Sequence, residues 1–216
     1  MIFSVTTHPA RNDDLIAYAE SAIEQGFNDI HLDFMDGVYT PEPASNVTEA
    51  KVLALAFPDA EFCVHIMSAS PEKHCKQFYN AMRHLTRKGK NEIVFQIEGA
   101  KKPLKILKKH ARGIAIDLDT DVKIIDKRVL ERCGSVLVML VKAGASGQKQ
   151  ESAALEKIKW LKENYPHINV IADGGINKDT LKASMESGAD VLSLGSFGYQ
   201  LIKEEKGKQF LDKNHK

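Results

Sequence analysis

The sequence lacks the features that mark secreted and membrane-bound proteins. It has three cysteines in 216 residues, and Cys63, Cys75 and Cys133 share no CxxC spacing. We therefore expect neither a disulfide framework nor a structural zinc site, and this usage is typical of a reducing cytoplasm. The N-terminal segment turns polar too early for a signal peptide, and no apolar run approaches the roughly 20 residues of a membrane span. These absences predict a cytoplasmic protein without membrane attachment.

An excess of charge of either sign is also missing. Thirty Lys and Arg residues stand against 29 Asp and Glu residues, which gives a formal net charge of +1. No global field would therefore attract nucleic acid or an anionic membrane. Two lysine-rich stretches, residues 73–90 and 101–113, come without the aromatic-rich strand of an RNA-binding domain, so we interpret them as solvated helix faces. The composition predicts no nucleic-acid partner.

Short apolar runs alternate with segments of helical periodicity along the whole chain. Most runs are rich in Val, Ile and Leu with little polar alternation, which is typical of parallel strands buried on both faces. They cover residues 2–7, 29–35, 60–67, 92–98, 113–118, 135–141, 169–174 and 190–196. Strand-helix units in this number, without a linker, predict a single (β/α)8 TIM barrel over residues 1–216. A doubly wound open sheet is the alternative, but no GxGxxG follows the first run.

Helix signals lie between the runs. Eight helical segments follow the runs, and examples are residues 13–26, 46–57, 70–86, 120–134, 152–165 and 177–190. Asn12 or Asp13 is expected to cap the first helix, and Gly26 is expected to end it. Pro71, after Ser70, is favourable at the first position of another helix.

Four residues that bind metals and move protons stand at the carboxyl ends of three runs. His31 and Asp33 lie two positions apart in IHLDFMDG, so their side chains share one face of a strand. His65 in CVHIM and Asp173 in VIADGGI end two other runs. Because the carboxyl ends of barrel strands open into one mouth, we expect the four side chains to converge. Two imidazoles and two carboxylates suit Zn, Mn, Fe(II) or Co better than Ca or Mg.

Each of these residues has a structural alternative when it is taken alone. His31 and Asp33 could form a hydrogen-bonded pair at the barrel rim, His65 could be a core histidine, and Asp173 could form a turn with the glycines that follow it. The joint occurrence at equivalent strand ends favours a site for one divalent metal ion.

Glycine-bearing loops follow the last three runs. They contain Gly144, Ser146 and Gly147, then Gly174 and Gly175, and finally Gly195 and Ser196. Barrel enzymes often bind phosphate in the loops after the last strands, where glycine lets backbone N–H groups approach an anion. Ordinary turn glycines would explain any single loop, but three adjacent loops favour a phosphate site. Methionine at the ends of three runs most often fills core gaps, but could also form an apolar wall around a planar intermediate.

Several motifs, in order along most of the chain, resemble the ribulose-phosphate 3-epimerase family. They are IFSVTT, IHLDFMDGVYTPE, CVHIM, VLVMLVKAGASGQK, IADGGIN and ADVLSLGS. The resemblance implies a (β/α)8 barrel of the ribulose-phosphate-binding type. It also implies an isomerase of the pentose phosphate pathway that converts D-ribulose 5-phosphate to D-xylulose 5-phosphate. By analogy with such barrels, we expect a homo-oligomer with a sugar-phosphate substrate.

The resemblance implies a role for each matching residue. His31, Asp33, His65 and Asp173 would bind the metal ion (Zn, Mn, Fe or Co), and Asp33 and Asp173 would be the acid/base pair. The substrate would be contacted by Ser4, Met35, Met67, Met139, Gly144, Ser146, Gly147, Gly174, Gly175, Gly195 and Ser196, with the glycine-bearing loops holding its phosphate. Removal of the C3 proton gives an enediolate, and two carboxylates on opposite faces of this plane would invert the carbon.

The chain departs from the family pattern in loops that would face the substrate. Residues 38–42 read VYTPE where the family has HFVPN, Gln96 replaces a histidine, and Asp117-Leu118 replaces Asn-Pro. These departures raise the hypothesis that the substrate is a different, longer or polysaccharide-precursor ketose phosphate, with Glu42, Asp117 and Lys142 as the residues responsible.

Two further alternatives compete with a 3-epimerase. A decarboxylase or hexulose-phosphate synthase would need an Asp-x-Lys-x-x-Asp motif, but in HLDFMD Asp33 is followed by Phe34 and Met35 and no lysine is present. The second alternative is a barrel that binds metal or phosphate without catalytic activity. The complete set of two histidines and two aspartates argues against it, because neutral drift would usually erode at least one member.

Overall fold

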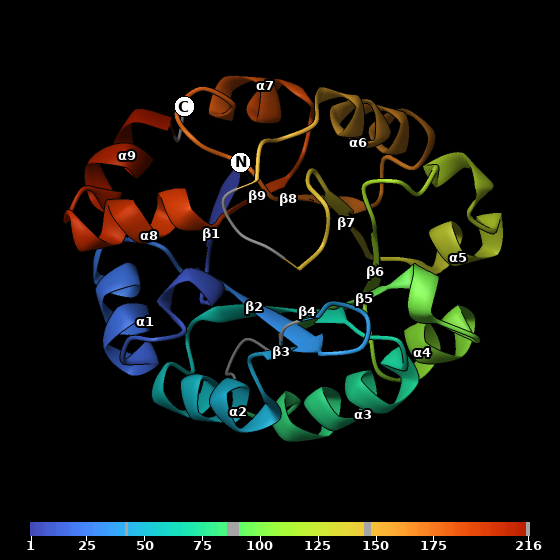
Figure 1. Ribbon diagram of the computed structural model, residues 1–216, viewed down its shortest axis with the longest axis horizontal. Coiled ribbons are helices and arrows are strands. Elements are labelled where there is room, and N and C mark those ends of the chain that lie inside the picture. Colours follow the sequence, from blue (N-terminus) through green and yellow to red (C-terminus); the bar gives the residue numbers. More distant parts are fainter. Residues whose placement is uncertain (42, 86–90, 145–147, 215–216) are drawn as a thin grey trace.

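The computed structural model describes residues 1–41, 43–85, 91–144 and 148–214, and shows a closed barrel surrounded by helices (Figure 1). The strand order is β1-β9-β8-β7-β6-β5-β4-β2-β3, and β1 also pairs with β2, which closes the ring. The parallel barrel strands are β1 (Ile2–Thr6), β2 (Asp29–Asp36), β4 (Glu61–Met67), β5 (Glu92–Gln96), β6 (Gly113–Ile116), β7 (Ser135–Met139), β8 (Asn169–Asp173) and β9 (Val191–Leu194). The predicted (β/α)8 barrel is confirmed.

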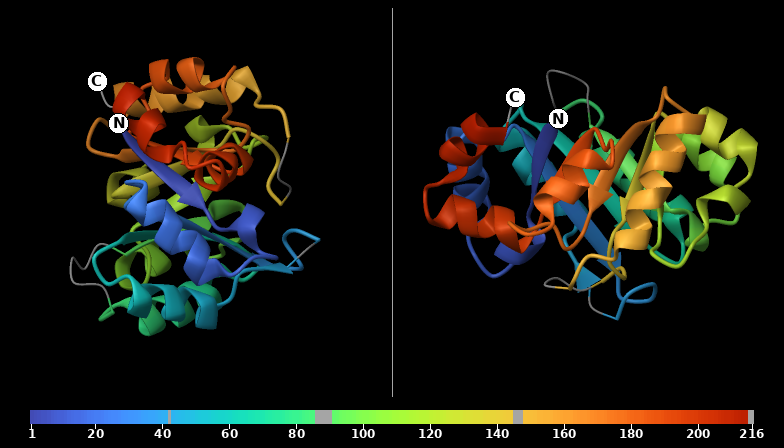
Figure 2. Two further views of the ribbon diagram at one scale, coloured as in Figure 1. Left: turned by 90° about the vertical axis from the view of Figure 1, so that its left-hand side faces the viewer. Right: turned by 90° about the horizontal axis from the view of Figure 1, so that it is seen from above.

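Helices form the outer layer (Figure 2). They are α1 (Leu15–Glu24), α2 (Val47–Ala56), α3 (Pro71–Met82), α4 (Pro103–Lys109), α5 (Lys127–Arg132), α6 (Ser152–Asn164), α7 (Leu181–Glu186), α8 (Ser196–Lys203) and α9 (Gly207–Asn214). Short 3-10 turns lie at η1 (His8–Ala10), η2 (Ile97–Gly99) and η3 (Val122–Ile124). Within the described ranges, no helix is long and apolar enough to cross a membrane.

Local hydrogen bonding corrects the predicted helix bounds. The first helix is capped by Asp14, whose Oδ1 accepts from the backbone N–H groups of Ile16 and Ala17, and not by Asn12 or Asp13. The predicted helix over residues 120–134 is divided into η3 and α5, because the carboxylate of Asp126 caps α5 and starts a new helix there. Asp14 follows Asn12 and Asp13, so the sequence alone leaves several equally good starts for the first helix.

A short strand, β3 (Pro43–Ala44), has no counterpart in the predicted set. It pairs antiparallel to the end of β2, with Met35 opposite Ala44. The chain reverses direction just before it because Asp36 Oδ1 accepts from the backbone N–H groups of Val38 and Tyr39, at 2.9 and 2.7 Å. The segment after β2 therefore folds back beside the carboxyl end of β2 instead of running straight to α2.

The two faces of the strands bury different kinds of side chain. On β2, Ile30 and Leu32 are fully buried and belong to the cluster between the barrel and the helices. A separate interior cluster includes Val94 and Leu137. Side chains alternate between the two faces of a strand, and those of Ile30 and Leu32 point outward to the helices. The alternate positions, His31 and Asp33, therefore point into the barrel.

Candidate metal centre and substrate cavity

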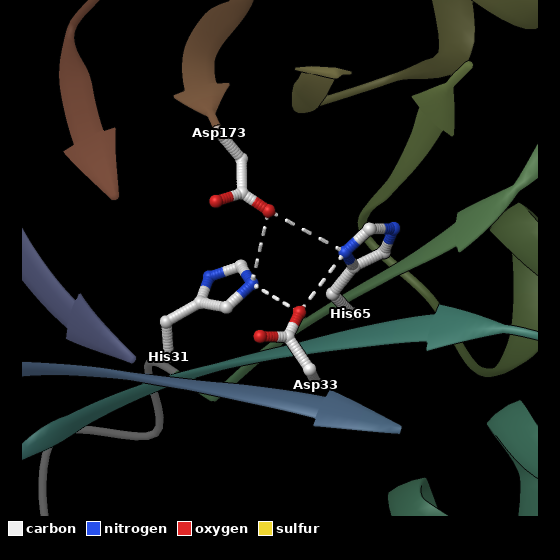
Figure 3. Close-up of side chains that lie close together, drawn as sticks. All are labelled: His31, Asp33, His65 and Asp173. Carbon is white, nitrogen blue, oxygen red and sulfur yellow. Dashed lines mark hydrogen bonds and ion pairs between the residues drawn. The ribbon is translucent and has the colours of Figure 1, made fainter. Parts of the chain in front are cut away.

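His31, Asp33, His65 and Asp173 point toward one another inside the barrel mouth (Figure 3). One possible ligand atom from each residue lies within 4.8 Å of those of the other three. The Nε2 atom of His31 is 3.2 Å from Asp33 Oδ1 and 3.8 Å from Asp173 Oδ2. The Nδ1 atom of His65 is 3.3 Å from the same oxygen of Asp33 and 3.8 Å from the same oxygen of Asp173. The predicted convergence of these side chains is present.

Strand register explains this convergence. Asp33 on β2 is opposite His65 on β4, and the inward-facing His31 precedes Asp33 by two residues. Asp173 is the last residue of β8, which approaches the same point from the other side of the ring. Rigid strands therefore hold all four side chains, and a site built on strands is positioned more tightly than one built on loops.

The hydrogen bonding of the cluster fits a metal ion. Both histidines are fully buried, and Asp33 and Asp173 are each 8% exposed. His65 Nδ1 faces the two carboxylates but forms no hydrogen bond in the described structure. The other ring nitrogen, Nε2, also has no hydrogen-bond partner there. A buried polar nitrogen without a partner costs about 1–3 kcal/mol, and a divalent cation held between this nitrogen and the two carboxylates would offset that cost. The donor set suits Zn, Mn, Fe(II) or Co.

The two carboxylates of the metal-free cluster have opposite pKa shifts. Burial raises the pKa of Asp33, but the His31 and His65 imidazoles outweigh this effect, so the pKa of Asp33 lies below its ordinary value. For Asp173, burial dominates over the imidazoles, and the negative charge of Asp33 acts with it, so its pKa is raised. Two nearby carboxylates with divergent pKa values are typical of an acid/base pair.

Metal binding is expected to release about one proton at pH 7. Burial lowers the pKa of His31, but the neighbouring Asp33 more than offsets this and raises it well above the ordinary value. The stabilising ion pair is therefore complete below the ordinary imidazole pKa and is lost only as the pH rises through the raised pKa. Because an imidazole binds a metal ion only in its neutral form, binding displaces this proton, and affinity falls with falling pH. Calorimetric titration in buffers of different protonation enthalpy measures the release; heats that are independent of the buffer would contradict it.

A cavity of about 430 Å³ opens directly above the cluster. Asp33 and Asp173 form part of its wall, together with Met35, Met67 and Met139 from the ends of β2, β4 and β7. Each of these methionines is at most 4% exposed. The cavity therefore joins the candidate metal site to an apolar wall.

The predicted phosphate loops border the same cavity. Gly144, Gly174, Gly175, Gly195 and Ser196 all line it, and α8 begins at Ser196 with its N-terminus toward the opening. Gly174 and Gly175 have φ values of +107° and +66°, which other residues rarely adopt. Backbone N–H groups at a helix N-terminus and in glycine turns favour an anion. The predicted Ser146 and Gly147 lie outside the described residues.

The described cavity wall lacks one residue that was expected to contact the substrate and contains three that were not expected. Ser4 is buried, and its hydroxyl donates to the backbone oxygen of Asp29 at 3.2 Å; it is not part of the described cavity wall. Thr6, His8 and Gln200 do line the cavity and were not predicted. Thr6 is the last residue of β1 and His8 directly follows the first apolar run, so their place at a strand end was the available signal.

Gln96 should be replaceable with a gain in stability. Its side chain is fully buried at the end of β5, and neither Oε1 nor Nε2 has a hydrogen-bond partner in the described structure. Gln96→Met keeps a similar shape and removes two unsatisfied polar atoms, so we expect the free energy of unfolding to rise by about 1–3 kcal/mol.

The matched control for this substitution is Gln150→Met. The Oε1 atom of Gln150 accepts a hydrogen bond from the Ser184 hydroxyl at 3.1 Å, so this change leaves a buried hydroxyl with one partner fewer and should destabilise the protein. Urea denaturation measures both effects. Equal losses of stability in the two variants would show that the Gln96 amide is satisfied in the folded protein.

Comparison with known sequences supports a family assignment. A model of the family described as "Ribulose-phosphate 3 epimerase family" matches residues 5–199. The chain is 30% identical to the ribulose-phosphate 3-epimerase of Eremothecium gossypii over 189 residues, which covers 81% of this chain and 76% of the relative. It is 32% identical to the protein of the same name from Methanocaldococcus jannaschii over 196 residues, covering 85% and 79%.

Solved structures show the likeness of the fold. The 3-hexulose-6-phosphate synthase from Salmonella typhimurium superposes with a TM-score of 0.67 over the full length of both chains, at 14% identity. Phosphoribosyl anthranilate isomerase from Thermus thermophilus has a TM-score of 0.61, at 14% identity, with 96% of each chain covered. Identities this low show a shared barrel and not a shared activity. The family model and the sequence relatives carry the assignment further: this chain belongs to the ribulose-phosphate 3-epimerase family, whose members are isomerases.

Proposed function

We propose that the protein interconverts D-ribulose 5-phosphate and D-xylulose 5-phosphate, with one divalent metal ion at His31, Asp33, His65 and Asp173. The observation that carries this proposal is one cavity bordered by Asp33 and Asp173 and by the glycine loops. Curated relatives named ribulose-phosphate 3-epimerase support the choice of substrate. A phosphate on C5 seated at the glycine loops would bring the sugar carbons toward the two carboxylates.

Two carboxylates provide what inversion at C3 requires. The C3 proton is adjacent to the C2 carbonyl, and its removal leaves a planar enediolate that can be protonated from either face. Asp33 and Asp173 come from different strands, β2 and β8, so their carboxylates can reach a sugar bound in the cavity from different sides. One carboxylate takes the proton from one face, and the other delivers a proton to the opposite face. In the reverse reaction the two residues exchange these roles.

The buried position of the pair supports proton transfer. Asp33 and Asp173 keep only a small exposed fraction, so few water molecules compete for the proton. When bound, the metal ion supplies Lewis-acid stabilisation of the negative charge that develops on the substrate oxygens. Met35, Met67 and Met139 give the plane an apolar and polarizable wall that excludes further water.

The hypothesis of a different ketose phosphate loses two of its supporting residues. Asp117 accepts hydrogen bonds within the protein, and Lys142 lies 3.7 Å from Asp119 in a neighbouring loop. Neither of them is part of the described cavity wall. Glu42, the third residue, lies outside the described residues. Pentulose phosphates remain the better candidates on this geometry.

The test is turnover on a panel of ketose phosphates of five to seven carbons, with the metal-loaded protein. We expect the highest kcat/KM for D-ribulose 5-phosphate, with lower values for the longer chains. A clearly better longer substrate would overturn the choice of sugar but keep the epimerase. No turnover on any substrate would overturn the proposal. The homo-oligomer stays a prediction, and sedimentation of the purified protein tests it.

A further inference from the structure

The segment that follows β2 is held to the barrel at its base. We call residues 37–41 the strap. Besides binding the strap through Oδ1, Asp36 accepts from the Ser68 hydroxyl at 2.8 Å and from the backbone N–H of Ala69 at 2.9 Å through Oδ2. One carboxylate therefore joins the start of the strap to the loop that follows β4, and its geometry is fixed from both sides.

A second attachment lies further along the strap. The Tyr39 hydroxyl is within 3.2 Å of Asp117 Oδ2 and 3.4 Å of Glu98 Oε2, so it donates to these carboxylates. Burial and both negative charges raise the pKa of Tyr39, which keeps the phenol protonated as a donor. Glu98 Oε1 in turn accepts from the backbone N–H of Asp117 at 2.9 Å. The strap thus bonds to the ends of β5 and β6.

The next strap residue touches the loop that follows β7. Thr40 is 2% exposed, and a Cβ atom placed on Gly144 would lie only 2.8 Å from its Cβ and Cγ2 atoms. Gly144 has a φ of +100° and lines the cavity. Figure 2 shows that the blue segment after β2 and the yellow segment after β7 project from the same end of the barrel. Thr40 therefore packs directly against a backbone position of the cavity wall.

The cavity is bordered unevenly by the barrel strands. Its described wall comes from β2 and β4 and from residues at or after the ends of β1, β7, β8 and β9, and none of it comes from β5 or β6. Glu98 follows β5 and Asp117 follows β6, and the carboxylates of both accept from the Tyr39 hydroxyl. The sequence departs from the family pattern in the strap and at Asp117, and a hydrogen bond joins these two places.

We propose that Tyr39 is a positioning residue for substrate binding. Its bond to Asp117 and Glu98 holds the strap, and through Thr40 the backbone at Gly144, in the form that accepts the substrate phosphate. The substrate identity rests on the proposed function, whereas the mechanical link does not. Tyr39 does not touch the cavity within the described residues, so it acts through Thr40 and Gly144.

Tyr39→Phe removes only the hydroxyl and tests this role. We expect the KM for D-ribulose 5-phosphate to rise about tenfold, with kcat within about twofold, because the loss falls on binding and not on the carboxylates. The dissociation constant of inorganic phosphate should rise by a similar factor. Tyr165→Phe, at the opposite end of the barrel after α6, is the matched control and should change neither value.

A double-mutant cycle shows whether the pair acts as one unit. If Tyr39 works through Asp117, Tyr39→Phe combined with Asp117→Ala should raise KM no more than the worse single variant. Asp117→Asn keeps a carbonyl acceptor for the phenol and should recover most of the wild-type KM. Fully additive effects would overturn the assignment of Asp117 as the partner.

Hydrogen exchange of the protein without substrate separates this proposal from the proposed function. Amides of residues 37–40 and 140–144 should both exchange faster in Tyr39→Phe, by about tenfold, even if the protein turns over no pentulose phosphate. Faster exchange confined to residues 37–40, or unchanged exchange in both segments, would overturn the link. Wild-type KM and phosphate affinity in a folded Tyr39→Phe variant would overturn its role in binding.

Discussion

Asp173→Asn is expected to lower the rate of epimerisation at least a thousandfold, on the order of the effect of a general acid/base group. The variant should nevertheless still exchange the C3 proton of one epimer with solvent. Asp33 remains on its own face of the sugar, where it can remove a proton and return one without inversion. Asp33→Asn should show the reverse selectivity and exchange the other epimer. Deuterium incorporation into each purified epimer, followed by NMR in D₂O, measures both variants.

The control for these variants is their metal content, because both aspartates belong to the candidate ligand set. Exchange is compared only between samples loaded to equal stoichiometry. If both variants exchange the same epimer, one carboxylate serves both faces and the two-base assignment is wrong. If neither variant retains exchange while the metal is bound, the two aspartates act as ligands alone.

Removal of the metal should abolish turnover and lower the melting temperature. The buried His65 Nδ1 and the two carboxylates then face one another without a cation. An ion present at 1,000 times its dissociation constant stabilises the folded state by about 4 kcal/mol. We therefore expect a loss of several degrees on treatment with a chelator, and recovery with Zn, Mn, Fe(II) or Co. Differential scanning calorimetry with and without added metal measures this shift.

His65→Gln shows whether the stabilising metal ion binds at the cluster of His31, Asp33, His65 and Asp173 or elsewhere on the protein. It removes one imidazole from the cluster, so added metal should raise its melting temperature much less than that of the wild type. His84→Gln, on the exposed turn after α3, is the control and should respond like the wild type. An equal thermal response of His65→Gln and the wild type would place the stabilising ion elsewhere.

The barrel and its central cluster could be predicted because they follow from strand periodicity. Inward-facing positions alternate along a strand, and the carboxyl ends of all barrel strands meet. His31 and Asp33 on one run therefore had to meet His65 and Asp173 from two others. The glycine loops followed from the same rule, and Gly144, Gly174, Gly175, Gly195 and Ser196 do border one cavity.

The strap could not be predicted, because its contacts join loops that are distant in sequence. Tyr39 and Asp117 are 78 positions apart, and neither lies within a periodic element. The two residues of β3 are too few to show a strand period. The departure from the family pattern at Asp117 suggests a residue that selects the substrate, but its place beside Tyr39 depends on how the loops fold. The positions of strand ends predict which residues lie near the barrel mouth. The conformations of the loops determine which of their side chains reach the cavity.

Proton NMR of D-ribulose 5-phosphate with metal-loaded protein in D₂O is the decisive experiment for the epimerase assignment. We expect deuterium at C3 and the appearance of D-xylulose 5-phosphate, both dependent on the metal and on Asp33 and Asp173. Stoichiometric metal binding without exchange at C3 of any ketose phosphate would contradict the epimerase assignment, and absence of metal binding would contradict the site itself.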